Sequence, residues 1–445
     1  MTIDALVRTP GRDNRLRSTR NSGRMVNEYW SSLYRAREEG RKVLWYNGQK
    51  MNVFAQAAGV AWVHGEAYSA LLAARHLEGP AQKAASDHGF MQEVCSYSRT
   101  HMGCALAGDS GGAPPPAPGE MPDAEAMARG LPVPDMLISA YPGCSSGQQW
   151  DDALGRLFGQ KLPVFNVNIP FLWGNQGDGI EGPEWEGAVR YLTQQLRESI
   201  AFIEQQTGRP FDMDELCRIM SYVKQAAILR NEAMALCSAR PSPASYFDWI
   251  ASIAPLNFMP ASQALVDYYA GVKTEIEERI ARGEGAVRDE KYRLYFDGIM
   301  NWNNLGLLSK KFASYGATVM CGRYTHRAFW TQPHLIDVND PLPGIAKHFL
   351  LCPLNHSVFD QVDFALEDSV KYGVDGMVFH VSRTCRSMTS PQYVMAEAAQ
   401  RKLGLQTMMF EGDVADVAFY DDAIMTTRLE AMLESIEMQR QRVAA

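Results

Sequence analysis

Cysteines are the residues of this chain whose positions most clearly indicate chemistry. Two of the eight stand after apolar runs: Cys144 follows DMLISAYPG, and Cys385 follows GMVFHVSRT. Each lies in a turn rich in Gly, Ser or Thr that opens a predicted helix, where backbone N–H groups favour negative charge. A thiolate there has a lowered pKa and can ligate a metal. Cys95 also precedes a helix-like run. The alternative for each is a small core residue, but a site in a cleft between two domains would collect Cys144 and Cys385.

The other five cysteines are Cys104, Cys217, Cys237, Cys321 and Cys352. No two of the eight form a Cys-x-x-Cys pair, which excludes local zinc-ribbon and thioredoxin motifs. Eight cysteines in 445 residues are also too sparse for a disulfide scaffold. Cys352, in FLLCPLNHS, is the first candidate for an additional metal ligand, with an incidental buried thiol as the alternative. Cys217 and Cys237 lie in amphipathic segments and are predicted to be core residues.

Other polar candidates follow predicted strands or lie near the cysteines. Asn301 and Trp302 come directly after the apolar run RLYFDGIM, and Trp302 could line an aromatic pocket or pack in the core. His101 lies shortly after Cys95 and could donate a proton or be a capped surface residue. His380 lies within a predicted buried strand and is interpreted as a core histidine.

The elements that would position these residues alternate between strands and helices. Apolar runs predict strands at 43–46, 135–140, 163–169, 294–297, 317–321, 376–381 and 407–410. Helical spacing is found at 27–38, 51–107, 148–158, 184–240, 262–282, 305–315, 359–372 and 393–403. Strand–helix–strand order is typical of a parallel sheet. We therefore predict an α/β fold with two Rossmann-like, open parallel-sheet domains, joined by helices and preceded by an N-terminal helical arm. Such sheets bind ligands at the carboxyl ends of their strands.

The predicted boundaries are an arm and helix at 1–41, a first α/β domain at 42–183, a helical connecting region at 184–290 and a second α/β domain at 291–445. A proline-rich linker at 113–122 interrupts the first domain. Asp212, with Glu215 three residues later, resembles a helix capping box. A basic cluster near the start is interpreted as a solvated arm or docking tail; its members are Arg8, Arg12, Arg15, Arg17, Arg20 and Arg24.

Composition excludes several classes of function. With 43 Lys and Arg against 51 Asp and Glu, the net charge is −8, so we expect no nucleic-acid partner. The longest uncharged stretch, 249–266, contains Pro255 and Pro260, which would break a helix, so no membrane span is expected. No secretory signal is visible, and the expected location is the cytoplasm. A phosphate-binding GxxxxGK[ST] loop is absent, and GDGIEG at 177–182 follows no strand directly and is interpreted as a loop.

Taken together, three cysteine-bearing turns resemble those of the 2-hydroxyacyl-CoA dehydratase and class I (ATP-dependent) benzoyl-CoA reductase family. They are CSYSRTHMG (95–103), SAYPGCSSGQQW (139–150) and HVSRTCRS (380–387). Three further segments extend the resemblance: RPSPASYFDWI (240–250), ARGEGAVRDEKYRLYFDGIMNW (281–302) and FEGDVAD (410–416). The combination most resembles the larger substrate-reducing subunit of benzoyl-CoA reductase and covers residues 27–435.

The resemblance implies that Cys95, Cys144 and Cys385 hold an iron–sulfur cluster. The cluster would be a [4Fe–4S] cubane or, with extra cysteines such as Cys352, a double cubane. Cys thiolates are the usual ligands of such clusters. In this interpretation Tyr141 and Gln148 flank Cys144 and could hydrogen-bond the cluster or a thioester carbonyl.

The resemblance also implies an oxidoreductase subunit, active only in a complex, that dearomatises an aryl-CoA thioester. The candidate catalytic residues are Trp302, Asn301 and His101. Its partners would be a homologous smaller substrate-reducing subunit and ATP-hydrolysing iron–sulfur activator subunits. Two alternatives stay open: a subunit of a 2-hydroxyacyl-CoA dehydratase, and a non-catalytic electron-relay subunit. The substrate is expected in the cleft between the two α/β domains, where Arg383 and Arg386 could pair with CoA phosphates.

Overall fold

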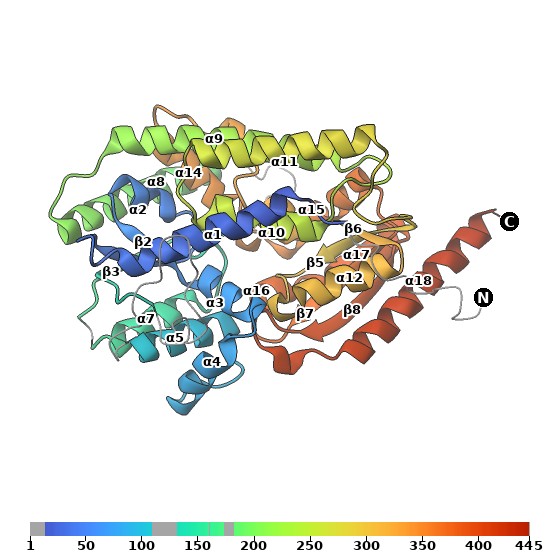
Figure 1. The fold of residues 1–445 in the computed structure, drawn as a ribbon, viewed down its shortest axis with the longest axis horizontal. Coiled ribbons are helices and arrows are strands. Elements are labelled where there is room, and N and C mark those ends of the chain that lie inside the picture. Colours follow the sequence, from blue (N-terminus) through green and yellow to red (C-terminus); the bar gives the residue numbers. More distant parts are fainter. Residues whose placement is uncertain (1–13, 109–130, 160, 173–181, 445) are drawn as a thin grey trace.

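Two parallel four-stranded sheets organise the chain, each covered by helices (Figure 1). The structure is a computed structural model and describes residues 14–108, 131–159, 161–172 and 182–444. The prediction of an α/β fold with two open parallel-sheet domains is confirmed. The proline-rich segment 113–122 and residues 177–181 of the glycine-rich loop lie outside the described residues.

The first sheet has the strand order β2-β1-β3-β4. Its strands are β1 (Val43–Gly48), β2 (Ala61–His64), β3 (Met136–Ala140) and β4 (Val164–Val167). All pairs are parallel, and β1, β2 and β3 are buried along their whole length. This matches the nearly continuous apolar runs of strands that are covered on both faces. The prediction that 51–107 is mostly helical is wrong at β2, a four-residue strand within that range.

The second sheet repeats this arrangement with the order β6-β5-β7-β8. Its strands are β5 (Tyr292–Asp297), β6 (Ala317–Cys321), β7 (Gly376–Ser382) and β8 (Gln406–Gly412). In both sheets the chain adds its second strand on one side of the first strand and its third strand on the other. The strand order therefore reverses between β1 and β3 and between β5 and β7. Ligands of open α/β sheets bind at the carboxyl ends beside such points.

Helices cover the sheets and connect them. In the first half they are α1 (Ser18–Arg35), α2 (Asn52–Ala57), α3 (Gly65–Ala74), α4 (Glu78–Asp87), α5 (Ser96–Gly108), α7 (Gly147–Leu157), α8 (Pro183–Thr207), α9 (Met213–Leu236), α10 (Tyr246–Phe258) and α11 (Gln263–Ala281). The second half contains α12 (Leu305–Ser314), α13 (Arg323–Arg327), α14 (Pro341–Leu350), α15 (Val358–Tyr372), α16 (Arg386–Thr389), α17 (Gln392–Leu403) and α18 (Asp422–Ala444). Short 3₁₀ turns are η2 (Trp302–Asn304), η3 (Pro333–Leu335), η4 (Pro353–Asn355) and η5 (Val417–Phe419).

Helix α9 shows how local sequence sets an element boundary. Asp212 is its N-cap and accepts a hydrogen bond from the backbone N–H of Glu215 at 2.8 Å. The Glu215 carboxylate pairs with Arg218 at 2.6 Å. One half of the predicted capping box is therefore present. The helix then runs alongside α11 over both sheets (Figure 1).

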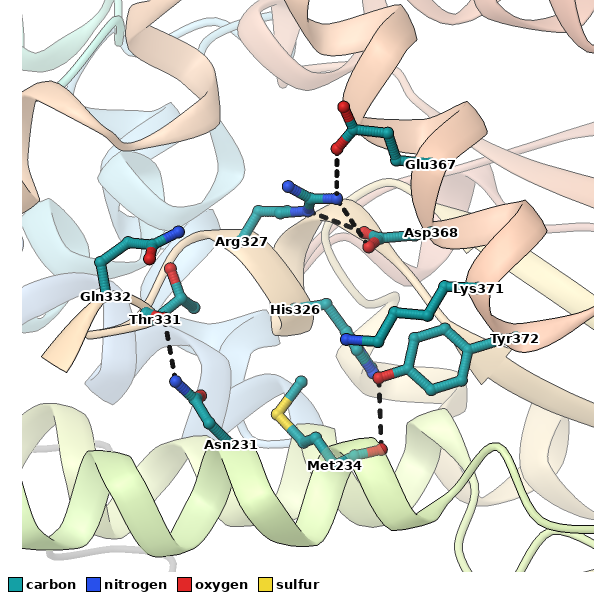
Figure 2. A pocket seen from close by; sticks show the side chains of 10 residues that line it. All are labelled: Asn231, Met234, His326, Arg327, Thr331, Gln332, Glu367, Asp368, Lys371 and Tyr372. Carbon is teal, nitrogen blue, oxygen red and sulfur yellow. Dashed lines mark hydrogen bonds and ion pairs between the residues drawn. The ribbon is translucent and has the colours of Figure 1, made fainter. Parts of the chain in front are cut away.

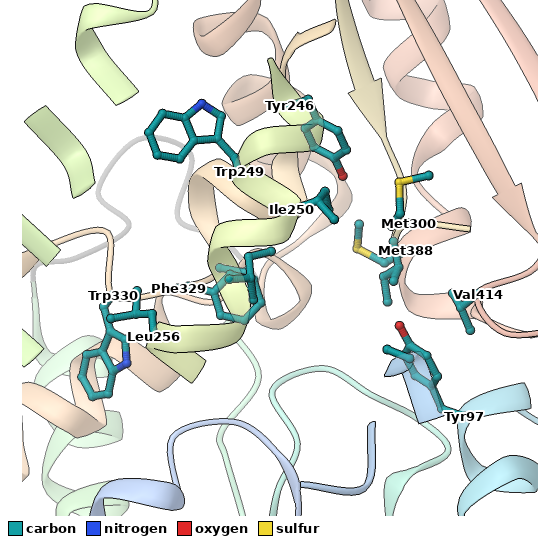
Figure 3. Packing of buried hydrophobic residues seen from close by; sticks show 14 of the residues in the cluster. Tyr97, Tyr246, Trp249, Ile250, Leu256, Met300, Phe329, Trp330, Met388 and Val414 are labelled. Atoms are coloured by element: carbon teal, nitrogen blue, oxygen red, sulfur yellow. The ribbon is translucent and has the colours of Figure 1, made fainter. Parts of the chain in front are cut away.

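Helix α10 corrects the expectation of a proline break at Pro255 only, because Pro260 does lie in the interruption between α10 and α11. The helix continues through Pro255 to Phe258. A capping box of Ser245 and Asp248 fixes its start, and Trp249 and Ile250 are almost completely buried. Tertiary burial thus outweighs the lost backbone hydrogen bond. In Figure 3, α10 residues lie beside buried side chains from both halves, including Tyr97, Met300, Met388 and Val414.

The described part of the basic arm is docked on the chain itself. Arg15 Nε donates to Asp248 Oδ1 at 3.2 Å, and the buried Leu16 donates its backbone N–H to the same oxygen at 2.9 Å. Arg17 lies 3.5 Å from Glu275. The solvated-arm interpretation is therefore wrong for Arg15, whereas the side chains of Arg17 and Arg24 are mostly exposed. Arg8 and Arg12 lie outside the described residues.

Candidate functional site

The three cysteine turns meet at one place between the sheets. Burial raises the pKa of Cys95, and the neighbouring thiolates of Cys385 and Cys144 raise it further. Burial likewise raises the pKa of Cys385 to about 12, with a contribution from Cys144. The pKa of Cys144 rises to about 11, mainly through burial. These mutual effects place the three thiols near one another, but among the described residues their side chains do not form a group arranged to hold a metal ion.

Backbone N–H groups at the starts of helices oppose this effect at each thiol. The N–H of Ser98 in α5 lowers the pKa of Cys95, and those of Ser146 and Gly147 at the start of α7 lower the pKa of Cys144. The N–H of Met388 in α16 does the same for Cys385. Helix N-termini carry partial positive charge. The donors offset burial only in part, so the prediction of a lowered thiol pKa in these turns is wrong for Cys95, Cys144 and Cys385.

Side-chain hydrogen bonds tie the three turns to one another. The buried carboxylate of Asp413 accepts from the hydroxyl of Ser96 and from the backbone N–H of Thr384 at 2.9 Å. The backbone N–H of Ser96 donates to Thr384 Oγ1 at 3.1 Å. Ser387 Oγ donates to the carbonyl oxygen of Gly143 at 2.8 Å. The turns of Cys95, Cys144 and Cys385 are thus joined directly, without relying on the sheets alone.

An apolar cavity of about 280 Å³ adjoins this place. Aliphatic side chains of α3 and α10 form much of its wall, including Ala67, Ala70, Leu71, Ile250 and Ile253. Aromatic residues complete it: Tyr97, Trp302 and Tyr324. Trp302 Nε1 donates a hydrogen bond to the hydroxyl of Tyr97, which fixes both rings. The cavity therefore suits a largely apolar group with a planar part.

Glu66 supplies a carboxylate to this cavity, and no sequence pattern indicated it. Its charge raises the pKa of Cys144, after the larger effect of burial, and contributes to the raised pKa of Cys385 and of Tyr324. Glu66 Oε2 lies 3.6 Å from Nε2 of His64, at the end of β2. Because β2 was not predicted, nothing marked Glu66 as a residue at the carboxyl end of a strand.

A second cavity, of about 300 Å³, is lined in part by Cys144. It is lined mainly by polar groups, which include Ser139, Tyr141, Gln148, Asn166, Asn168 and Asn355. The hydroxyl of Tyr141 donates to Asp151 Oδ1 at 3.1 Å. Cys144 thus lines the polar cavity, and both of its predicted neighbours, Tyr141 and Gln148, lie in the same wall.

The predicted catalytic residues separate in the structure. Trp302 lines the apolar cavity. Asn301 is fully buried and accepts from Asn304 Nδ2 at 3.1 Å. His101 is also fully buried, with its ring 4.6 Å from that of Trp45, and burial lowers its pKa to about 3. Neither Asn301 nor His101 lines the two cavities. A catalytic role for Asn301 or His101 therefore stays a prediction, and their buried positions away from both cavities do not support it.

The additional cysteines lie in different surroundings. Cys352 is buried, and its Sγ accepts from Gln49 Nε2 at 3.9 Å. Cys104, Cys237 and Cys321 are buried, and Cys217 is partly exposed on α9. The expectation of a core position is thus wrong for Cys217. Over the described residues, no group of three His, Cys, Asp or Glu side chains is arranged to hold a metal ion.

A third cavity, of about 300 Å³, lies apart from the thiols between α9 and α15 (Figure 2). Arg327 reaches into it and pairs with Asp368 at 2.7 Å and Glu367 at 3.0 Å. Lys371 also lines the cavity, so two cations balance two carboxylates and the cavity offers no strong preference for an anion or a cation.

Comparison of the sequence with known proteins identifies the family of this chain. Residues 53–436 match the family model described as 2-hydroxyglutaryl-CoA dehydratase, D-component. One of the benzoyl-CoA reductase subunits of Thauera aromatica is 28% identical over 366 residues, 79% of this chain and 78% of that protein. The (R)-2-hydroxyisocaproyl-CoA dehydratase alpha subunit of Clostridioides difficile is 24% identical over 418 residues, 94% of this chain and 95% of that protein.

The alpha subunit of lactoyl-CoA dehydratase from Anaerotignum propionicum is 25% identical over 410 residues, 90% of this chain and 92% of that protein. These relatives are named as subunits, which indicates multi-subunit complexes. None of the described helices has the length and apolar character needed to cross a membrane. The match over most of the chain confirms the resemblance: this protein belongs to the 2-hydroxyglutaryl-CoA dehydratase D-component family.

Proposed function

We propose that this chain is the iron–sulfur subunit of an ATP-dependent aryl-CoA reductase of the benzoyl-CoA type. The observation that carries the proposal is the meeting of three cysteine turns beside an apolar cavity with aromatic walls. Cys95, Cys144 and Cys385 would hold the cluster, since three thiolates are a suitable donor set for iron and sulfide. The N–H groups around them would offset its negative charge. When bound, a [4Fe–4S] cluster would supply low-potential electrons.

The residues of the chain itself would bind and orient the substrate. The aliphatic wall formed by α3 and α10 would exclude water from the acyl group. The rings of Trp302, Tyr97 and Tyr324 would pack against an aryl ring. Glu66 would place a carboxylate near the reacting part of the thioester. Cys352 would stay outside a single cubane, although a double cubane could recruit it.

The proposed partners follow from what the chain lacks and from its relatives' names. Without a phosphate-binding loop, the chain would need an ATP-hydrolysing iron–sulfur activator. The names of the relatives imply further subunits, and we propose that a smaller homologous subunit completes the complex. The complex would dearomatise the aryl ring by transfer of single electrons.

A 2-hydroxyacyl-CoA dehydratase subunit is the second candidate. It is favoured by the match to the 2-hydroxyisocaproyl-CoA dehydratase alpha subunit, which covers 94% of this chain. The same cysteines would serve, but the reaction would remove a hydroxyl group. Electron counting separates the two: a reductase consumes electrons in proportion to product, whereas a dehydratase needs only catalytic amounts.

Anaerobic iron and sulfide analysis tests the cysteine assignment. We expect about four irons per chain and a loss of most of them in Cys144→Ser. Cys217→Ser is the matched control, because Cys217 is partly exposed on α9 and should leave the iron content unchanged. Wild-type iron content in Cys144→Ser would contradict the assignment. About eight irons in the wild type would favour a double cubane.

A further inference from the structure

A buried carboxylate lies behind the wall of the polar cavity. Asp151, on α7, is 1% exposed. Its Oδ1 accepts hydrogen bonds from Ser139 Oγ at 2.8 Å, Tyr141 OH at 3.1 Å and Asn47 Nδ2 at 3.4 Å. Among the described residues, Oδ2 has no hydrogen-bond partner. Three donors thus converge on one oxygen, while the other can carry a proton without breaking a hydrogen bond.

The hydroxyl donors connect this carboxylate to the cavity that contains Cys144. Ser139 and Tyr141 both belong to the wall, and Asp151 lies behind them. Asn355, in the same wall, is 1% exposed, and its Oδ1 has no hydrogen-bond partner in the part of the chain that the structure covers. Buried polar atoms normally find a partner. The cavity is therefore built for a polar occupant, such as water or the polar part of a substrate.

The chemistry of the pair suits proton donation near neutral pH. Burial raises the pKa of Asp151 to about 7, although the hydrogen bonds from Ser139, Asn47 and Tyr141 lower it. When the carboxyl group rotates so that the protonated Oδ2 faces the oxygen of Tyr141, the neutral acid can donate its proton to that oxygen, and the phenol's own O–H turns to the cavity. Burial also raises the pKa of Tyr141 well above its usual value, so the phenol stays neutral between transfers.

We propose that Tyr141 and Asp151 are the proton-donating pair of this site. The inference rests on the proposed function, because both ring reduction and removal of a hydroxyl group consume protons. The O–H bond of Tyr141 breaks as its proton passes through a water in the polar cavity to the substrate, and the Asp151 proton replaces it on the phenol oxygen. Asp151 is left as a carboxylate and regains a proton from solvent. The electrons come separately, from the ATP-hydrolysing iron–sulfur partner.

Other ionisable groups surround the pair and would shape its pH dependence. Asp152, next to it on α7, raises the pKa of Asp151. The charges of Glu66 and Cys144 act on Tyr141. All of these are acids, and no basic group contributes among the causes that set the pKa of Asp151. These neighbouring acids raise the pKa of Asp151 and Tyr141, so both groups hold their protons to higher pH.

A structural role would also explain a buried aspartate, because Asp151 ties β3 to α7. The experiment must therefore include measurements that a structural role would not change. Tyr372→Phe is the matched control: it removes a buried phenol hydroxyl that donates to the carbonyl oxygen of Met234 at 3.2 Å, at the third cavity, apart from the thiols. Iron content of each variant shows whether the cysteine turns are intact.

The test uses the complete complex with its partners. We expect turnover to fall about 100-fold in Tyr141→Phe and Asp151→Asn, with unchanged iron content, and to change less than about threefold in Tyr372→Phe. Wild-type turnover should decline as the pH rises through about 7, and Asp151→Asn should lose this inflection. Full activity in Tyr141→Phe, or an unchanged inflection in Asp151→Asn, would overturn the proposal.

A second measurement does not depend on turnover. Infrared spectroscopy of the isolated chain should show a protonated-carboxyl band that disappears as the pH rises through about 7 and is missing in Asp151→Asn. An identical band in Asp151→Asn would overturn the proton-donating role of Tyr141 and Asp151 and would leave the proposed function untouched. Absence of turnover in the wild-type complex with every acyl-CoA thioester would instead refute the proposed function, and with it this role for the pair.

Discussion

A buried ion pair holds the turn of Cys385 and gives a sharp test of how the site depends on the fold. Arg323 and Asp297 are both fully buried, with Nε–Oδ1 at 3.0 Å and a second contact between the guanidinium and Oδ2 at 2.9 Å. Arg323 also donates to the carbonyl oxygen of Met388 at 2.8 Å, and Gln392 Nε2 donates to Asp297 Oδ2 at 3.0 Å. We predict that Arg323→Met destabilises the chain and disturbs the Cys385 turn.

The magnitude follows from the charge that the substitution leaves behind. Asp297 would remain as a buried carboxylate without its cation, which typically costs about 3–5 kcal/mol. Adding Asp297→Leu should recover much of this loss, because replacing both charges with apolar groups is often neutral. Arg401→Met is the matched control: Arg401 pairs with Glu397 at 2.8 Å, but both side chains are more than half exposed, so about 0–1 kcal/mol is expected.

Urea unfolding followed by circular dichroism measures these free energies, and iron analysis of the folded variant reports on the turn. We expect Arg323→Met to lose both stability and iron, and Arg401→Met to lose neither. A loss below about 1 kcal/mol in Arg323→Met would refute the reasoning, because Asp297 would then have a source of compensation that the structure does not contain. Normal iron content despite a large loss would show that the clamp stabilises the sheet and not the cysteine turn.

Three further predictions concern single side chains. The folded-state pKa of Asp151, about 7, exceeds its ordinary value of 3.8, so the chain should lose up to about 4 kcal/mol as the pH rises from about 4 to above 7. Asp151→Asn should flatten this dependence in urea titrations at several pH values, and an unchanged slope would contradict it. Trp302→Ala should weaken the turnover of aromatic thioesters about tenfold with unchanged iron content, whereas loss of iron would identify Trp302 as a structural residue. Asp212→Ala should cost about 1 kcal/mol of unfolding free energy through the lost cap of α9, and no change would show that the cap is redundant.

Local sequence predicted most strands because buried parallel strands are continuous apolar runs. The exception, β2, shows the limit of that signal. Its four residues, AWVH, lie between two helices. In so short a run, the pattern of apolar residues does not distinguish a strand from one turn of a buried helix. What makes it a strand is its pairing with β1, from Val43 with Ala61 to Tyr46 with His64. Because β2 was not predicted, Glu66 could not be recognised as a residue that follows a strand.

Two other differences depend on contacts between distant residues. Pro255 is a helix breaker by its covalent structure, yet α10 tolerates it because the helix is buried between the two sheets. Arg15 belongs to a polar arm, yet it finds Asp248 more than two hundred positions away. Neither partner is visible in a window of neighbouring residues.

The site shows the same division between local and distant information. The Gly- and Ser-rich turns after β3 and β7 indicated where N–H groups would favour a thiolate, and the family resemblance added Cys95. Asp151 carried no such signal, since the Asp-Asp pair in an amphipathic helix suggests an exposed face. Its burial depends on Ser139 and Tyr141, which the fold of β3 brings against α7.

The repeated strand order explains why this site needs both halves of the chain. Cys144 follows β3 and Cys385 follows β7, the strands that occupy equivalent positions in the two sheets. Each sheet therefore contributes one thiol from the point where its strand order reverses, and Cys95 adds the third. Asp413 and Thr384 form hydrogen bonds with Ser96 across the two halves. The position of the thiols therefore depends on how the two sheets pack. A substitution that loosens either sheet should consequently reduce iron binding before it unfolds the chain.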